Sequence, residues 1–364
     1  MNRLSLGNIK ALFQQYESYL SACTLILGFA FDYLTLHRVD YFLDNVFVMS
    51  YLVIAGVCIT IMNLYEEGKL RNRFFEGIID FLPFVLQFAF GGLFSAFTIF
   101  YSKSASLFSS GAFVLILFVL LVGNEFFKKR YEKLVFQVTL YFTSIFFFFI
   151  YFLPVLIKKM GAWVFLGSGA VSLMLIAVFA YILSRYSPLR YEEERRILIF
   201  SVLSLFVFIN VLYFTNIIPP IPLSIKSQDV YHFVEKQADG SYVGIEEKDN
   251  RWYRSLTREV VHLKPDEPAY VFSSVFAPTD LNTQIIHDWQ YYDETKGEWV
   301  SASKIPFMII GGRNNGFRAF SMKDNIFQGK WRVDVETDRG QVIGRLRFDV
   351  KIGEPPFGLE SHRL

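Results

Sequence analysis

Residues 197–222 read ILIFSVLSLFVFINVLYFTNIIPPIP, and this stretch decides the fold. Its first part, Ile197–Ile218, contains no charged side chain over about 20 residues, the length that a helix needs to cross roughly 30 Å of hydrocarbon. Pro219, Pro220 and Pro222 follow at once; they stop the helix and favour a short extended spacer. The stretch therefore predicts the end of a membrane helix and a boundary between two different domains.

Six apolar stretches of similar length precede Ile197. With boundaries soft by a few residues, they are Tyr19–Leu36, Phe47–Tyr65, Ile79–Tyr101, Leu107–Phe127, Leu134–Ile157 and Ala162–Ser184. Backbone N–H and C=O groups find no water in hydrocarbon, and these stretches lack the alternating polarity of a barrel strand. The sequence therefore predicts a membrane α-helical bundle of about seven transmembrane helices over residues 1–218. The composition agrees, with 53% hydrophobic residues, 41 Phe and a mean hydropathy of +0.33.

The basic residues between these stretches alternate sides and gather on one of them. That side receives Arg3, Lys10, Lys69, Arg71, Arg73, Lys128, Lys129, Arg130, Lys133, Arg185, Arg190, Arg195 and Arg196. The other side receives Arg38, Lys103, Lys158 and Lys159. By the positive-inside rule the first side is cytoplasmic, and an odd number of spans places the C-terminal region outside. The first span follows a short basic stretch without a small-residue cleavage site, so we interpret it as an uncleaved signal-anchor.

The spans hold few groups that transport would require. Four carboxylates lie near span ends, where they can reach water: Asp32, Asp44, Asp80 and Glu125. The polar residues at depth are neutral amides that a neighbouring helix can satisfy: Gln87, Gln137 and Asn210. Both cysteines, Cys23 and Cys58, lie within spans, where inert packing is the ordinary role. The pattern favours a structural scaffold over conduction or transport.

Beyond Pro222 the apolar residues recur at every second position, which is typical of strands. Trp331, Val333 and Val335 share one face of a predicted strand, and a turn at residues 338–340 leads into a return strand over 342–350. Further strands are predicted at Val230–Val234, Tyr242–Glu246, Glu259–Leu263, Tyr270–Phe276, Gln284–Tyr292, Trp299–Ser303 and Phe317–Ser321. The sequence thus predicts a proline-containing stalk at 219–226 and an all-β antiparallel sandwich domain over 227–352, immunoglobulin-like or jelly-roll-like. Residues 353–364 are predicted to be a tail.

One block within this domain resembles a known family. His287-Asp288-Trp289, Gly311-Gly312-Arg313, Gly316-Phe317-Arg318, Gly329-Lys330-Trp331-Arg332-Val333-Asp334-Val335 and Gly340-Gln341-Val342-Ile343-Gly344-Arg345 carry the resemblance. Together they resemble the bacterial domain of unknown function 2914, over about residues 280–351. That family occurs at the C-termini of bacterial proteins, often behind membrane segments. The resemblance implies a multi-pass protein of the bacterial inner (cytoplasmic) membrane with a periplasmic or extracellular C-terminal domain, and it implies no reaction.

Seven residues are candidates for ligand binding: His287, Trp289, Tyr291, Arg313, Arg318, Lys323 and Arg332. The first three share one face of a predicted strand, as a core edge with a hydrogen-bonded imidazole or as a shallow ligand-binding face. The four basic residues suit an anion-binding patch for a carboxylate, a phosphate or an acidic envelope polymer, or else solvated strand faces paired with Asp324 and Asp334. Aromatic side chains suit either sugar stacking or an ordinary core: Trp252, Tyr253, Tyr291 and Tyr292.

Other chemistries find less support. Gly311 and Gly316 have the spacing of a phosphate loop, but Phe317-Arg318 stands where Lys-Ser/Thr should follow, so a surface loop is the better interpretation. His232, His262 and His287 are far apart in sequence, and we predict neither a metal site nor a cofactor. The charge of residues 221–364 is near neutral, which speaks against nucleic acid.

Three classes of function stay open. The first and favoured class is a membrane-anchored binding or interaction module for an envelope component or partner protein, since no catalytic constellation is visible. The second is a transporter, channel or sensor whose sandwich assists or gates the helices. The third is an envelope enzyme. The predicted partners are the lipid bilayer and an envelope polymer or protein, and the sequence does not indicate an oligomeric state.

Overall fold

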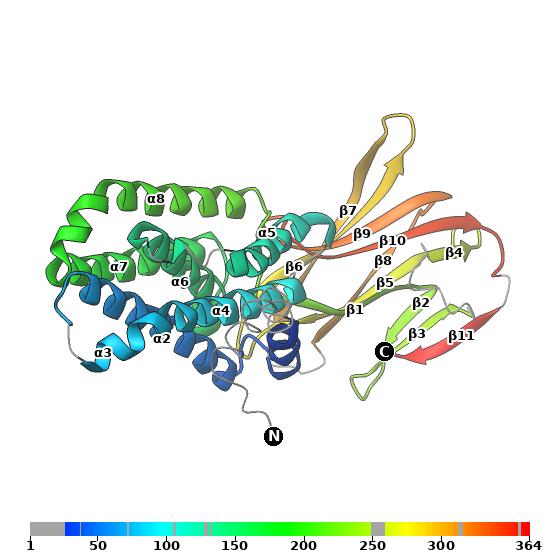
Figure 1. Ribbon diagram of the computed structural model, residues 1–364. Coiled ribbons are helices and arrows are strands. Elements are labelled where there is room, and N and C mark those ends of the chain that lie inside the picture. Colours follow the sequence, from blue (N-terminus) through cyan, green and yellow to red (C-terminus); the bar gives the residue numbers. More distant parts are fainter. Residues whose placement is uncertain are drawn as a thin grey trace, which may run out of the picture. The chain divides into compact units, whose positions relative to one another are not determined.

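The computed structural model describes residues 26–364, apart from 37, 71–72, 105–106, 127–129, 132, 249–258, 312–315 and 356–357. The chain divides into two compact units, a helical one that ends at Phe214 and a strand-rich one that includes Thr215–Leu364. Figure 1 shows the helices of the first unit and the strands of the second. Several residues discussed above lie outside the described residues: Arg3, Lys10, Cys23, Arg71, Lys128, Lys129, Trp252, Tyr253, Gly312 and Arg313.

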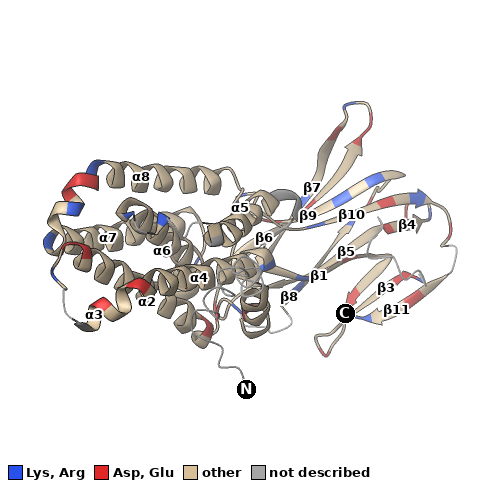
Figure 2. Ribbon diagram, in the orientation of Figure 1, with Lys and Arg blue, Asp and Glu red and all other residues tan. Residues whose placement is uncertain are grey.

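The N-terminal half is helical and apolar, as the sequence predicts. Its elements are α2 (Phe42–Glu66), α3 (Arg73–Ile78), the 3-10 turn η1 (Ile79–Phe81), α4 (Leu82–Ser104), α5 (Leu107–Phe126), α6 (Leu134–Ile157), α7 (Ala162–Tyr186) and α8 (Pro188–Phe214). Among the described residues, five helical stretches are long and apolar enough to cross a membrane: Phe42–Glu66, Phe74–Ser104, Leu134–Ile157, Ala162–Tyr186 and Pro188–Phe214. Figure 2 shows that charged residues in this unit gather near helix ends and leave long uncharged stretches between them.

Two of the seven predicted spans stay predictions. Within the first predicted span, the structure describes a shorter apolar helix, Ile26–Thr35. Within the fourth predicted span, the described apolar helix is Ser110–Asn124. The seventh span is confirmed as a helix, but its boundaries differ from the prediction. Helix α8 begins at Pro188, before the charged residues 190–196, because proline suits the first turn of a helix.

Aromatic side chains and glycines bring the helices together. Phe147 is buried and its ring meets that of Phe97 edge-on at 5.9 Å, while Phe146 stacks on Phe206 at 5.8 Å. A Cβ at Gly92 would lie 2.6 Å from the ring of Tyr51 on α2, so any larger residue would push this ring away. The buried members of the phenylalanine run at 146–149 therefore face neighbouring helices.

Neutral amides join the helices in pairs. The side-chain nitrogen of Asn63 on α2 donates to Oε1 of Gln137 on α6 at 2.8 Å, and both residues are fully buried. Asn124 of α5 donates through its side chain to the backbone carbonyl of Gln87 on α4 at 3.0 Å. A neighbouring helix therefore accepts a hydrogen bond from each of these side-chain nitrogens, which is one way in which helices in lipid hold polar groups.

The C-terminal unit consists of strands in the described residues. They are β1 (Ser224–Tyr231), β2 (Phe233–Lys236), β3 (Tyr242–Glu247), β4 (Glu259–Leu263), β5 (Ala269–Phe276), β6 (Asn282–Asp293), β7 (Glu298–Ile310), β8 (Phe317–Lys323), β9 (Gly329–Thr337), β10 (Val342–Ile352) and β11 (Leu359–Arg363). Three sheets form, with the orders β1-β5-β8, β4-β10-β9-β6-β7 and β11-β3-β2. All neighbours pair antiparallel except β4 and β10, which run parallel, so the prediction of a wholly antiparallel domain is wrong at this one pair.

The β1-β5-β8 sheet lies between the other two. On one face, Val271 of β5 packs with Trp289 of β6 and Trp331 of β9 in a core shared with the five-stranded sheet. On the other face, Phe272 of β5 packs with Tyr242 of β3 in a core shared with the β11-β3-β2 sheet. Strand β5 is consequently buried on both faces and does not show the alternating burial of a two-layer domain.

The predicted hairpin at residues 331–350 is confirmed. Strands β9 and β10 pair antiparallel around a turn in which Gly340, at φ +76°, donates its N–H to the carbonyl of Thr337 at 2.9 Å. The register shifts between Val342 and Gly344, and this bulge places Ile343 in a core cluster. The charged side chains of β9 and β10 consequently occupy the outer face of the five-stranded sheet.

Two predicted segments differ from the structure. The predicted tail, 353–364, contains β11, which pairs with β3 and was missed because its residues, LESHR, show no apolar alternation. The predicted stalk is not a free spacer either. Residues 218–223 are buried, Leu223 belongs to a core cluster, and the side chain of Gln341 donates to the carbonyl of Ile218 at 3.3 Å.

Candidate functional site

His287 lies in the core of the strand-rich unit, at the contact between two sheets. Its ring nitrogens lie 2.7 Å from the hydroxyl of Ser273 on β5 and 2.8 Å from that of Ser321 on β8. The indole N–H of Trp289 donates to the same Ser321 hydroxyl at 2.9 Å. His287 is fully buried, and burial lowers its pKa to about 3, so the imidazole is neutral at physiological pH. Of the two alternatives left open above, this geometry is that of the hydrogen-bonded core histidine.

The remaining candidate ligand residues lie apart from one another. Tyr291 packs against Trp331 and Phe327 in the same core as Trp289. Arg318 and Lys323 lie at opposite ends of β8, in the β1-β5-β8 sheet, whereas Arg332 lies on β9 of the five-stranded sheet. The structure therefore does not bring the described basic candidates into one patch, and Arg313 lies outside the described residues.

The outer face of the five-stranded sheet carries a row of charges across four strands. Asp288 of β6 faces Asp334 of β9, an arrangement that is unfavourable for two isolated carboxylates. A cation flanks each of them. Lys304 of β7 lies 3.8 Å from Asp288, and Arg345 of β10 donates two 2.6 Å hydrogen bonds to Asp334. Across the sheet, two cations thus enclose two carboxylates. The charges of the two buried aspartates are therefore compensated within the sheet.

Glu336 adds a third carboxylate beside this row. Its Oε1 accepts a 2.8 Å hydrogen bond from Nζ of Lys304. Burial raises the pKa of Glu336, although the bond to Lys304 opposes the shift. The same bond, followed by the charges of Glu336 and Asp288, raises the pKa of Lys304, although partial desolvation opposes it. These mutual contacts indicate a structural ion network.

Next to this network, the same face presents aromatic rings beneath cations. The guanidinium of Arg332 lies 4.5 Å above the ring of Trp299, and Nζ of Lys330 lies 5.3 Å from the ring of Tyr292. The rings of Tyr292 and Trp299 meet edge-on across β6 and β7, with their centroids 5.3 Å apart. We call Tyr292, Trp299, Lys330 and Arg332 the aromatic–basic patch. All four side chains are partly or largely exposed, and sequence reasoning had singled out Tyr292 and Arg332 but missed Trp299 and Lys330.

A second cluster joins two histidines through carboxylates. Nδ1 of His232 lies 2.8 Å from Oε1 of Glu267, and its Nε2 lies 3.4 Å from Oε1 of Glu247. Nδ1 of His262 lies 2.9 Å from Oε2 of Glu247, and Oε1 of Glu247 accepts the backbone N–H of His262. Burial alone would lower the pKa of His232, but the bonds to Glu247 and Glu267 raise it above its ordinary value.

Among the described residues, two groups of side chains have the spacing of metal ligands. One is Glu246, Glu360 and His362, and the other is Asp229, Glu246 and Glu259. Sequence reasoning missed them because their members come from four separate strands, β1, β3, β4 and β11, of which β11 was not predicted. The alternation of charge in LESHR, with Glu360 and His362 on one face, was the signal present in the sequence.

Comparison with known proteins identifies part of this unit. Residues 282–350 match the model of the family described as "Protein of unknown function (DUF2914)". The matched segment runs from the start of β6 into β10 and contains the Gly-Lys-Trp-Arg-Val-Asp-Val block on which the resemblance was based. The resemblance that the sequence predicts is confirmed. The match covers β6, β7, β8 and β9, and therefore most of the outer face that bears the aromatic–basic patch.

The other comparisons give no further information about the fold. No curated protein matches the chain. Among solved structures, a Pseudomonas fluorescens alkylpurine DNA glycosylase, AlkC, bound to DNA containing an abasic site analog aligns at 9% sequence identity and a TM-score of 0.21. The alignment covers 86% of this chain and 99% of the other. At that TM-score the likeness supports no inference about fold or function.

Proposed function

We propose that this chain is an integral, multi-pass protein of the bacterial inner membrane whose strand-rich unit lies outside the cytoplasm and binds an acidic envelope polymer. The N-terminus would lie in the cytoplasm. The five long apolar helices and the excess of Lys and Arg in alternate connections support a membrane location with this orientation. The helical unit then serves as the anchor, and the strand-rich unit as the binding module.

The aromatic–basic patch is the observation that carries the binding proposal. Aromatic rings offer apolar faces on which sugar rings stack, and the cations of Arg332 and Lys330 lie over those rings, where they can pair with carboxylate or phosphate groups. Hydrogen bonding from Nε of Arg332 to Oε1 of Gln290, at 2.7 Å, fixes the guanidinium on the surface of Trp299. A polymer that alternates sugar rings and anionic groups matches this surface.

Binding can be tested with the full-length protein in detergent. Alginate, a sugar polymer with one carboxylate per ring, serves as the probe, and neutral dextran of similar length serves as the control. We expect binding to alginate that weakens as salt rises, because the contact is partly ionic. Trp299→Ala and Lys330→Ala should each weaken binding about tenfold, the effect of losing roughly 1.4 kcal/mol.

Lys236→Ala is the matched control, since Lys236 is an exposed lysine on β2 of a different sheet. Equal binding of alginate and dextran, or equal loss in Lys330→Ala and Lys236→Ala, would contradict a role of the patch. Loss of binding only in the patch variants, together with unchanged circular dichroism, would support it.

The orientation needs a separate test. With Cys23 and Cys58 replaced by serine, single cysteines are introduced as Ala238→Cys in the exposed β2–β3 turn and as Glu193→Cys near the start of α8. An impermeant thiol reagent, applied to cells whose outer barrier has been permeabilised, should label position 238 and spare position 193. The reverse labelling pattern would overturn the proposed orientation.

A further inference from the structure

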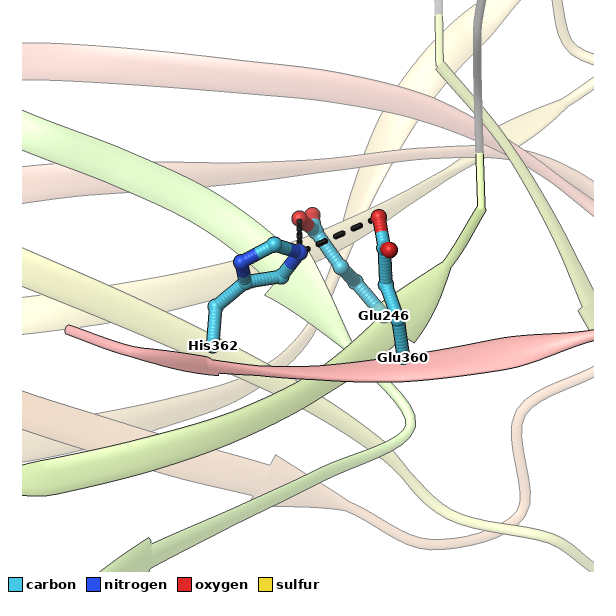
Figure 3. A group of neighbouring side chains, drawn as sticks. All are labelled: Glu246, Glu360 and His362. Carbon is cyan, nitrogen blue, oxygen red and sulfur yellow. Dashed lines mark ion pairs between the residues drawn. The ribbon is translucent and has the colours of Figure 1, made fainter.

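Three side chains from β3 and β11 converge on one point. The two strands pair antiparallel with Glu360 opposite Glu246 and His362 opposite Gly244, so Glu246, Glu360 and His362 share one face of their sheet. Figure 3 shows the two carboxylates turned toward the imidazole. Nε2 of His362 lies 3.2 Å from Oε1 of Glu246 and 3.1 Å from Oε1 of Glu360.

These distances fit a shared metal ion. Zinc binds histidine nitrogen and carboxylate oxygen at about 2.0–2.2 Å, which places neighbouring ligand atoms of a tetrahedral site roughly 3.3–3.5 Å apart. All three ligand atoms here lie within 4.8 Å of one another, and two of the separations lie within a few tenths of an ångström of that spacing. A neutral imidazole has one N–H and can donate it to only one of two carboxylates at a time, whereas an ion between the three atoms binds all of them.

Two more carboxylates supply oxygen atoms beside this group. Asp229 of β1 and Glu259 of β4 bring their carboxylates within 4.8 Å of that of Glu246. Glu246 consequently belongs to two groups of potential ligands, and His362, whose side chain is 46% exposed, keeps its own group open to ions from solution. The mixture of imidazole and carboxylate suits a transition ion; calcium and magnesium prefer oxygen ligands alone.

We propose that Glu246, Glu360 and His362 form a zinc-type divalent metal site that fastens β11 to β3. Three protein ligands leave a fourth position, which water can fill. Zinc binds an imidazole nitrogen that carries no proton, so protons compete with the metal and acid weakens binding. The site is independent of the polymer-binding proposal, because none of its residues lies in the aromatic–basic patch.

The test uses full-length protein in detergent, purified without a polyhistidine tag and stripped with EDTA. Zinc is returned, the protein is dialysed, and bound metal is counted by elemental analysis, with affinity measured by competition against a chromophoric chelator. We expect one zinc per chain, no tight calcium binding, and at least a tenfold loss of zinc affinity in His362→Ala and in Glu360→Gln. Both substitutions lie on the partly exposed strand β11, and circular dichroism would report whether the sheets persist.

His262→Gln is the matched control, because it removes a histidine from the neighbouring cluster without touching the proposed ligands. Zinc binding that survives His262→Gln and disappears in His362→Ala supports the site. Absence of zinc from the unaltered protein at micromolar concentrations overturns the proposal. Binding that persists unchanged in both β11 variants, or that disappears only in His262→Gln, also overturns it, since the ion would then be held elsewhere.

Discussion

Acid should destabilise the strand-rich unit through a single residue, His287. Its pKa falls from an ordinary 6.5 to about 3 in the folded chain because the imidazole is buried. Protonation is therefore easy in the unfolded chain and costly in the folded one, and folding stability that is fully present above pH 6.5 is lost as the pH falls toward 3. Each pH unit in this interval costs about 1.4 kcal/mol, so His287 alone should remove roughly 3 kcal/mol between pH 7.5 and pH 4.5.

Urea unfolding of the full-length protein in detergent measures this loss. Trp289 donates to the hydroxyl that also contacts His287, and with Trp331 it is buried in the same core, so tryptophan emission reports on this unit. His287→Gln keeps a neutral group able to donate and accept hydrogen bonds, but it cannot take up a proton. Although the variant is less stable at pH 7.5, the gap to the unaltered protein should shrink by roughly 3 kcal/mol at pH 4.5.

A stability gap that stays constant from pH 7.5 to pH 4.5 would refute the reasoning, since it would mean that His287 is not a neutral, buried base. If His287→Gln is too unstable to purify, Ser321→Ala offers a second route. It removes one hydrogen bond to the imidazole and leaves the histidine buried, so the acid sensitivity should persist.

Three further outcomes follow from the same structure. His232→Gln should destabilise the protein more at low pH than at high pH. Glu247 and Glu267 raise the pKa of His232 against the effect of burial. The stabilisation by His232 is therefore present below pH 6.5 and is lost as the pH rises through the folded pKa. The urea midpoint of His232→Gln should therefore lie further below that of the unaltered protein at pH 5.5 than at pH 9. Arg345→Met should cost about 3–5 kcal/mol in the same assay, because it leaves Asp334 buried without its cation, and the double variant Arg345→Met, Asp334→Leu should recover most of that loss. Gln137→Leu should lower the stability of the helical unit by about 1 kcal/mol, since it removes the acceptor of Asn63; a thermal shift of helical circular dichroism equal to that of a surface substitution would contradict this.

Much of the fold could be predicted from local sequence patterns. The apolar stretch Leu134–Ile157 matches α6 at both ends, and β4 occupies the predicted Glu259–Leu263, because apolar length and alternation report directly on burial. Strand β11 could not be predicted in this way. Its backbone pairs with β3 while its side chains stay largely exposed, so it leaves no apolar alternation in the sequence.

The candidate sites depended on which distant residues meet, and that information is not local. His287 and Trp289 were recognised as sharing a strand face, but their burial depends on Ser273 and Ser321 from another sheet. The spacing of Arg318, Lys323 and Arg332 in sequence suggested one basic patch, whereas the chain places β8 and β9 in different sheets. Trp299 meets Arg332 only because β6 lies between β7 and β9.

The central position of β5 means that the matched family segment is smaller than the folding unit that contains it. A fragment cut at residues 282 and 350 would retain β8 but lose β5, its hydrogen-bonding neighbour in the described sheet, and would expose Trp289 and Trp331 to water. Such a fragment would present open strand edges next to a bare apolar face, the combination that leads proteins to aggregate. Expression of this domain should therefore begin before β1, at the buried residues 218–223, and extend through β11.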